Sequence, residues 1–342
     1  MQLTRQQTQV INNKIKTRIF LEGPAGTGKT VTGVERMRYL MGKPSVSAGS
    51  ILVLAPQRAL GLAYEAVTRA PDRTAGAEPL ITTLGGLARQ MVDLFWPLVV
   101  EKAGFAHPDQ PPVFLTLETA QYTMQRVIGP VIDERDYFVT VAINRNRLYS
   151  QVIDNLNKAA VVGFPHTQIA DRLKAAWIGE LAQEHVYDEA QDCAQRFRDY
   201  CLQHNLLDFS LQVELFVHHL WQMDEPRRYL TNRYKHLIVD NIEEDTPVTH
   251  WLLSDWLETC KSALIIYDQD AGYRRFLAAD PDNALLLADA EFGHGGMDLR
   301  ADSQVLGEFE CHLVHRPALE PRTPVGAHAA GPALRWACSR VH

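Results

Sequence analysis

The residues with the clearest chemistry lie in one segment, 23–30, which has the spacing G-x-x-x-x-G-K-T of a phosphate-binding loop. Its predicted nucleotide ligands are Gly23, Gly26, Gly28, Lys29 and Thr30. The glycines let successive backbone N–H groups turn toward a phosphate, and Lys29 is placed to reach the β- and γ-phosphates. The Thr30 hydroxyl would ligate Mg²⁺. A glycine loop formed by chance is the alternative, but every position of the motif matches, so we expect a nucleoside triphosphate site.

The elements that such a loop requires flank it on both sides. Residues 18–22 form a short apolar stretch typical of a buried strand, and residues 31–41 carry apolar side chains at helical spacing. The order strand, loop, helix brings the helix N-terminus, with its partial positive charge, to the phosphates. The flanking sequence therefore supports a phosphate-binding loop.

A carboxylate for the metal is predicted at Asp240, which ends an apolar strand over residues 236–239. Enzymes with this loop hold Mg²⁺ through an acidic residue at the end of a neighbouring strand. An acidic residue also ends many strands that have no catalytic role, which is the alternative. Because the loop lies upstream, we expect Asp240 to face the metal together with Thr30.

The remaining apolar runs predict an α/β protein with a parallel sheet. The expected strands are 18–22, 51–55, 80–84, 236–240 and 262–268. From residue 86 to residue 205 the pattern changes to long helical stretches, which indicates a helical insertion. We expect a nucleotide-binding domain over 1–88 and 205–312, a helical subdomain over 89–204, and a disordered or aberrant tail over 313–342.

Length and composition limit the class of protein. The 342 residues suffice for two domains or for one domain with a large insertion, and a hydrophobic fraction of 46% is ordinary for a packed soluble protein. No apolar run is long enough to cross a membrane and the N-terminus has no signal-peptide core, so a cytoplasmic protein is expected. The five cysteines lack C-x-x-C spacing, which predicts free thiols rather than a zinc ribbon.

The net charge of −7 argues against a generally basic nucleic-acid binder, but the charge is unevenly distributed. Residues 1–50 contain eight lysines and arginines against two acidic residues, Glu22 and Glu35. This excess suits either a nucleic-acid backbone or the triphosphate, because both are anionic. Charge alone does not choose between the two partners.

The order of these segments resembles the N-terminal half of superfamily I helicases of the UvrD/PcrA/Rep type. Residues 3–7 (LTRQQ) resemble the family's opening L-N-x-x-Q, which implies that Gln7 contacts adenine. The later motifs fall in order at residues 23–30, 51–59, 81–88, 207–209, 238–241 and 266–270. The resemblance spans roughly residues 1–300 and implies a RecA-like P-loop NTPase with an inserted helical subdomain, with ATP and Mg²⁺ as cofactors and single-stranded DNA as partner.

The second motif departs from the family at the residue that activates water. The family has Asp-Glu, and the glutamate polarises the attacking water, whereas this chain has Asn241 after Asp240. An amide accepts no proton at neutral pH, so general-base catalysis, an effect of about 10²- to 10⁴-fold, is lost unless another carboxylate substitutes. We expect Glu243 or Glu244 to substitute, and an acidic turn exposed to solvent is the equal alternative.

Departures also affect the third motif and the DNA contacts. The glutamine and arginine of the third motif correspond to Ala271 and Leu277, and aromatic residues that touch DNA are replaced by Leu84 and Leu87. Base stacking, worth roughly 1–3 kcal/mol per base, is weakened accordingly. Residues 273–276 (YRRF) are a further candidate for phosphate contact, or they pack at a strand end.

The resemblance implies an ATP-binding, helicase-like ATPase module that acts on single-stranded DNA. Its catalytic residues would be Lys29, Asp240 and one of the two glutamates after Asn241. Few residues follow the third motif, so we expect weak turnover, no unwinding by this chain alone, and a protein partner that supplies a second RecA-like domain. The alternative is a non-motor, ATP-binding protein-interaction module with vestigial hydrolysis, and a P-loop kinase or other transferase is a third possibility.

Overall fold

The computed structural model describes residues 3–69, 76–176 and 184–291, which form two compact units. The first unit contains the described residues up to Leu87, then Asp224–Arg275 and those from Ala279 onward. The second contains Ala88–Met223 and the short piece Phe276–Ala278. The tail expected over 313–342 lies outside the described residues.

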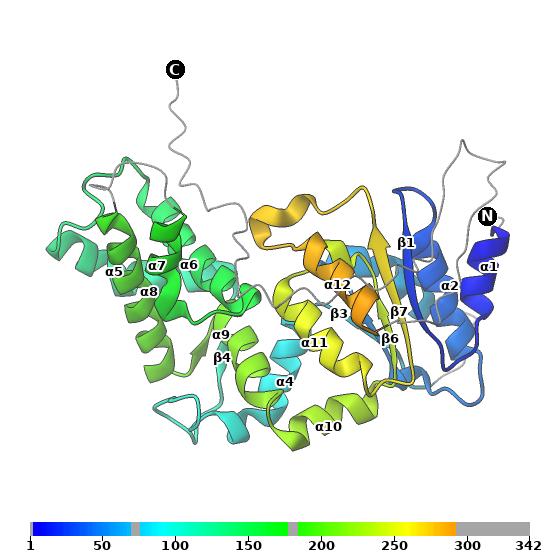
Figure 1. The fold of residues 1–342 in the computed structure, drawn as a ribbon. Coiled ribbons are helices and arrows are strands. Elements are labelled where there is room, and N and C mark those ends of the chain that lie inside the picture. Colours follow the sequence, from blue (N-terminus) through cyan, green and yellow to red (C-terminus); the bar gives the residue numbers. More distant parts are fainter. Residues whose placement is uncertain (1–2, 70–75, 177–183, 292–342) are drawn as a thin grey trace. The chain divides into compact units, whose positions relative to one another are not determined.

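Within the described residues, the first unit is built on a five-stranded parallel sheet with the strand order β1-β7-β6-β2-β3 (Figure 1). The strands are β1 (Arg18–Gly23), β2 (Ile51–Leu54), β3 (Leu80–Thr82), β6 (His236–Val239) and β7 (Ser262–Asp268). Gly23 lies opposite Asp268, and Leu54 lies opposite Val239. The parallel α/β fold is therefore as predicted, and the carboxyl ends of β1, β7, β6 and β2 meet at one edge.

Helices of the first unit follow the strands in chain order. They are α1 (Arg5–Asn12), α2 (Lys29–Met41), η1 (Ala48–Ser50), η2 (Arg58–Gly61), α3 (Leu62–Thr68), α10 (Asp224–Arg233), η6 (Ile242–Glu244), α11 (Pro247–Leu257), η7 (Tyr273–Leu277) and α12 (Pro281–Glu291). Helix α4 (Leu84–Val99) begins in this unit and continues in the second, and the last two residues of η7 also group with the second unit. The observed strand β3 is shorter than the predicted strand 80–84, because α4 starts at Leu84.

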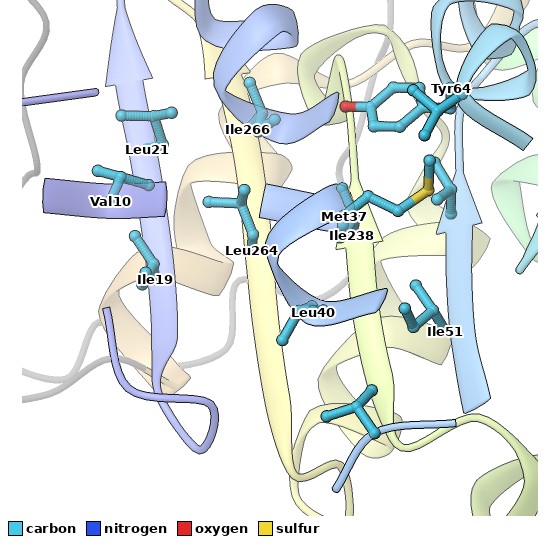
Figure 2. Close-up of a cluster of buried hydrophobic side chains, with 13 residues drawn as sticks. Val10, Ile19, Leu21, Met37, Leu40, Ile51, Tyr64, Ile238, Leu264 and Ile266 are labelled. Atoms are coloured by element: carbon cyan, nitrogen blue, oxygen red, sulfur yellow. The ribbon is translucent and has the colours of Figure 1, made fainter. Parts of the chain in front are cut away.

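The core of this unit forms where α2 and α3 cover one face of the sheet. Ile19 and Leu21 of β1 share a buried cluster with Met37 and Leu40 of α2 (Figure 2). Burying side chains of this size stabilises a fold by about 1.5–3 kcal/mol each. The cluster therefore fixes the position of the helix that starts at the predicted phosphate loop.

A buried arginine attaches α1 to the same helix. The guanidinium of Arg36 on α2 donates hydrogen bonds to the backbone oxygens of Ile11 (2.8 Å), Asn13 (2.6 Å) and Lys14 (2.9 Å) at the end of α1. Its side chain is only 2% exposed. These bonds satisfy carbonyls that the end of a helix leaves without partners, so α1 is held beside α2.

The second unit is mainly helical, and most of its residues lie between β3 and β6 in the sequence. Its elements after α4 are β4 (Val113–Phe114), α5 (Leu117–Glu134), α6 (Arg145–Val162), η3 (His166–Gln168), α7 (Ile169–Ala175), α8 (His185–Gln203), β5 (Leu206–Leu207), α9 (Phe209–Glu214) and the π-helical η5 (Leu215–Leu220). Buried Arg198 of α8 pairs with Asp208 and Glu214, and α9 packs on α6, so this unit extends beyond residue 205 to Met223. No helix in the described part of the chain is long and apolar enough to cross a membrane.

Candidate nucleotide-binding site

The loop between β1 and α2 has the backbone geometry of a phosphate cradle. Gly26 and Gly28 have φ angles of +78° and +80°, a region that glycine adopts without strain. A Cβ atom on Gly28 would lie 2.6 Å from the side-chain nitrogen of Gln7, so a side chain here would displace the Gln7 amide. The first N–H groups of α2 have no acceptor within the helix and carry the positive end of its dipole. The loop therefore fits an anionic phosphate.

Lys29 is fixed inside this loop. Its Nζ donates to the backbone oxygens of Gly23 (2.7 Å) and Pro24 (2.5 Å) and lies 3.3 Å from Oδ2 of Asp268. The side chain is only 6% exposed, and a buried cation is tolerated because a carboxylate and two carbonyls surround it. These contacts hold the positive charge at the loop.

The structure also brings Gln7 to the loop. Its Oε1 accepts from the Thr4 backbone N–H (2.9 Å), which completes a capping box at the start of α1, and its Nε2 donates to the Thr27 backbone oxygen (2.9 Å). A side-chain amide has a second N–H and a second lone pair. An adenine contact by Gln7 is therefore compatible with both bonds.

Asp240 follows β6 and has one oxygen that the protein leaves without a donor. Oδ2 accepts a hydrogen bond from the Tyr64 hydroxyl (2.8 Å), whereas Oδ1 is buried and has no partner among the described residues. Burial raises the pKa of Asp240, and the hydroxyls of Tyr64 and Thr30, the backbone N–H of Asn241 and the charge of Lys29 oppose that shift. A buried oxygen of this kind is costly unless a cation or water binds it.

The oxygens of Thr30 and Asp240 suit a Mg²⁺ ion that takes its other ligands from a nucleotide and water. They are too few to hold a metal ion by themselves. Among the described residues, no three or more His, Cys, Asp and Glu side chains gather into a metal site. Mg²⁺ is usually bound by one or two protein oxygens together with water and phosphate oxygens. The donor set therefore suits Mg²⁺ that arrives with a nucleotide.

Asn241 and Glu243 form a hydrogen-bonded pair beside Asp268. Asn241 Nδ2 donates to Glu243 Oε1 (3.2 Å), and the Asp268 backbone N–H donates to Glu243 Oε2 (3.0 Å). The Glu243 side chain has no solvent exposure, and burial raises the pKa of its carboxyl to about 7. A carboxyl group whose pKa is raised to about 7 thus accepts a hydrogen bond from the backbone of Asp268, the residue that pairs with Lys29.

Glu244 has different contacts from its neighbour. Its Oε1 accepts from the backbone N–H groups of Gly272 (2.9 Å) and Tyr273 (3.1 Å), and its Oε2 accepts from the backbone N–H of Arg274 (3.1 Å). All three donors belong to the segment after β7. The structure therefore groups Glu243 with the loop lysine through Asp268, and uses Glu244 to hold the segment after β7.

Three further side chains belong to the site but were not among the predicted ligands. Asp270 Oδ2 accepts from the Ala25 N–H in the loop (3.1 Å), Asp268 pairs with Lys29, and Tyr64 binds Asp240. The two aspartates lie in the segment 266–270, so motif order was a signal for them. Tyr64 has no such signal, because its hydroxyl reaches a residue 176 positions away.

Comparison with known families gives one match. The family model described as UvrD/REP helicase N-terminal domain matches residues 3–291. The matched span begins just before α1 and ends with α12, so it includes both units. Comparison with curated proteins found no significant match.

Proposed function

Because the chain belongs to the UvrD/REP helicase N-terminal domain family, we propose that its first unit binds Mg·ATP and hydrolyses it in response to single-stranded DNA. Helicases of this family generally use ATP and Mg²⁺ and bind DNA. Family membership supports a helicase or ATPase module. We further propose the role of each residue in the site and the stimulation of hydrolysis by single-stranded DNA.

The observation that carries the proposal is the unpartnered Oδ1 of Asp240 beside the loop that contains Lys29. When bound, Mg²⁺ would supply positive charge that neutralises the phosphates. Thr30 would contribute its hydroxyl to the metal, and Asp240 would contribute Oδ1, directly or through water. Lys29 would hold the β- and γ-phosphates, and Gln7 would orient the adenine.

We assign the general base to Glu243 and not to Glu244. Asn241 stands where the family has glutamate, and its amide cannot take a proton from water. Glu243 is hydrogen-bonded to that amide and has a pKa raised to about 7 by burial, which suits a base that works near neutral pH. Glu244 would instead hold the segment after β7 through its three backbone hydrogen bonds.

The contact with single-stranded DNA is proposed for the segment after β7. Tyr273 is 81% exposed, which is unusual for an aromatic side chain, and it is followed by Arg274 and Arg275. An exposed ring beside arginines offers a base-stacking surface with positive charge for the backbone. Glu244 anchors this segment next to Asn241, so DNA and the nucleotide site would communicate through η6.

Steady-state turnover of Mg·ATP with and without oligo-dT tests the proposed function. We expect saturating oligo-dT to stimulate the wild-type chain and to leave Lys29→Ala without turnover. Arg38→Ala is the matched control, because Arg38 is an exposed cation on the same helix and forms an ion pair with Glu35. Wild-type turnover with oligo-dT that is no higher than that of Lys29→Ala would contradict the motor function.

A non-motor ATP-binding module is the second candidate, and Asn241 favours it. In this candidate ATP closes a surface for a protein partner, and hydrolysis is vestigial. Ala271 in place of the family's glutamine supports the same conclusion. Binding of Mg·ATP that depends on Lys29, without any turnover above the Lys29→Ala level, would select this candidate over the first.

A further inference from the structure

Tyr64 connects a helix outside the nucleotide motifs to the predicted metal carboxylate. The ring is fully buried in the first turn of α3, and its hydroxyl donates to Asp240 Oδ2 at 2.8 Å. Figure 2 shows the Tyr64 ring at the edge of the core cluster with its hydroxyl directed away from α3. We infer that Tyr64 is a positioning residue that holds Oδ2 of Asp240 and leaves Oδ1 for the divalent cation.

The helix of the phosphate loop provides the space for this contact. A Cβ atom on Gly33 of α2 would lie 2.2 Å from the Tyr64 hydroxyl oxygen and 2.8 Å from Cδ1 of Ile266. Only glycine at this position lets the hydroxyl pass between α2 and the sheet. The chain therefore combines a glycine on one helix with a tyrosine on another to reach one carboxylate oxygen.

The asymmetry of the two Asp240 oxygens follows from this arrangement. Tyr64 donates a hydrogen bond to Oδ2, whereas Oδ1 is buried and lacks a hydrogen-bond partner among the residues that the structure describes. A carboxylate that is free to rotate presents either oxygen, and a fixed donor removes that freedom. Partners of this kind orient metal ligands, and their loss typically weakens metal affinity by about 10- to 100-fold.

This inference rests on the proposed function, because it needs a nucleotide-bound Mg²⁺ at Asp240. The test is the binding of N-methylanthraniloyl-ATP by the full chain, followed by fluorescence during a Mg²⁺ titration and again in EDTA. For Tyr64→Phe we expect the half-saturating Mg²⁺ concentration to rise about 10-fold, at the lower end of the effect of losing such a partner. Affinity in EDTA should match that of the wild type, because the phenyl ring keeps the packing.

Tyr149→Phe is the matched control. Tyr149 lies on α6 in the helical unit and is also buried, at 6% exposure, so this variant loses a tyrosine hydroxyl in the unit that does not contain Asp240. Its Mg²⁺ titration should match that of the wild type. A Tyr64→Phe curve that matches the wild type, or an equal loss of affinity with Mg²⁺ and in EDTA, would overturn the positioning role.

The wild-type titration distinguishes a failure of the Tyr64 inference from a failure of the proposed function. If the wild type binds the analogue in a Mg²⁺-dependent manner and Tyr64→Phe does not differ, the inference fails and the proposed function stands. If the wild type binds no analogue, the proposed function fails, and the inference fails with it.

Discussion

The two sides of the nucleotide site differ in how far they follow the family. On the β1–α2 side, every position of the phosphate-loop motif is present, and Lys29 is bonded to the loop itself. On the β6–β7 side, Asn241 replaces a glutamate and Ala271 replaces a glutamine. A loop of this kind binds phosphate mainly through backbone geometry, whereas activation of water depends on one side chain. Binding and hydrolysis can therefore diverge in the same site.

The β6–β7 side keeps a carboxylate in spite of its departures. Glu243 is fully buried and accepts from Asn241 and from the backbone of Asp268, which itself pairs with Lys29. Burying a carboxylate is costly without such donors. Whether the β6–β7 side supports hydrolysis thus depends on whether Glu243 accepts the proton from water that the Asn241 amide cannot accept.

The largest expected effect comes from Glu243→Gln. We expect turnover to fall by about 10²- to 10⁴-fold, the usual worth of a general base, while Mg·ATP affinity stays close to that of the wild type. Single-turnover kinetics with a parallel binding titration would measure both. Glu244→Gln serves as the neighbouring control and should lower turnover far less. Unchanged turnover in Glu243→Gln would remove Glu243 from the chemistry.

The pH dependence sharpens the same contrast. The pKa of Glu243 is raised from its ordinary value of 4.5 to about 7, so turnover should rise as pH increases through about 7, where the base loses its proton. Between these two values the folded chain binds more protons than the unfolded chain, so the free energy of unfolding should fall as pH rises. Glu243→Gln should lack this contribution, which urea unfolding below and above the window would measure.

Next in size is the effect of Lys29→Ala on binding. Hydrogen bonds to a charged group contribute about 1.5–3 kcal/mol, so affinity for Mg·ATP should fall by about 10- to 100-fold. Calorimetric titration measures it, with Arg38→Ala as the control that keeps affinity. If Lys29→Ala bound as tightly as the wild type, the β1–α2 side would not be the binding side.

A smaller effect, on stability, is expected from Gly33→Ala. Gly33 lies on α2 next to the Tyr64 hydroxyl that binds Asp240 after β6. The added methyl group would clash with the Tyr64 hydroxyl, and overpacking typically costs about 1–3 kcal/mol of unfolding free energy. Gly76→Ala is the control, because no described atom lies within 4 Å of its Cβ position. Denaturant unfolding should also show a smaller cost in the Tyr64→Phe background, because the clashing oxygen is gone.

The smallest expected effect is that of Glu244→Gln on the segment after β7. The amide keeps one acceptor oxygen and loses the other, so one of the three backbone hydrogen bonds is broken at a net cost of about 1 kcal/mol. Hydrogen exchange should become faster at the amides of Gly272, Tyr273 and Arg274, while those of α2 stay protected. Unaltered exchange in this segment would show that Glu244 does not anchor it.

The sequence predicted the family and the sheet because their signals are local. Apolar runs of strand length gave the five parallel strands, and the order of the motifs gave the UvrD-type resemblance that the family match confirms. The roles of Gln7, Lys29, Thr30 and Asp240 stay predictions, although the structure brings all four to the loop or to its edge. Residues 205–223 group with the helical unit because α9 packs on α6, a contact that no local pattern indicates.

What the sequence determined by itself is the phosphate loop, since eight consecutive residues specify both its backbone and its lysine. Tertiary structure decided which of two adjacent glutamates points to the site, because the short η6 turn after β6 directs Glu243 toward Asp268 and Glu244 toward residues 272–274. It also decided that Tyr64 binds Asp240, because three segments distant in the chain must meet for that bond to form. Spacing along a chain predicts contacts within one element, whereas contacts between elements follow from the packing of the sheet and its helices.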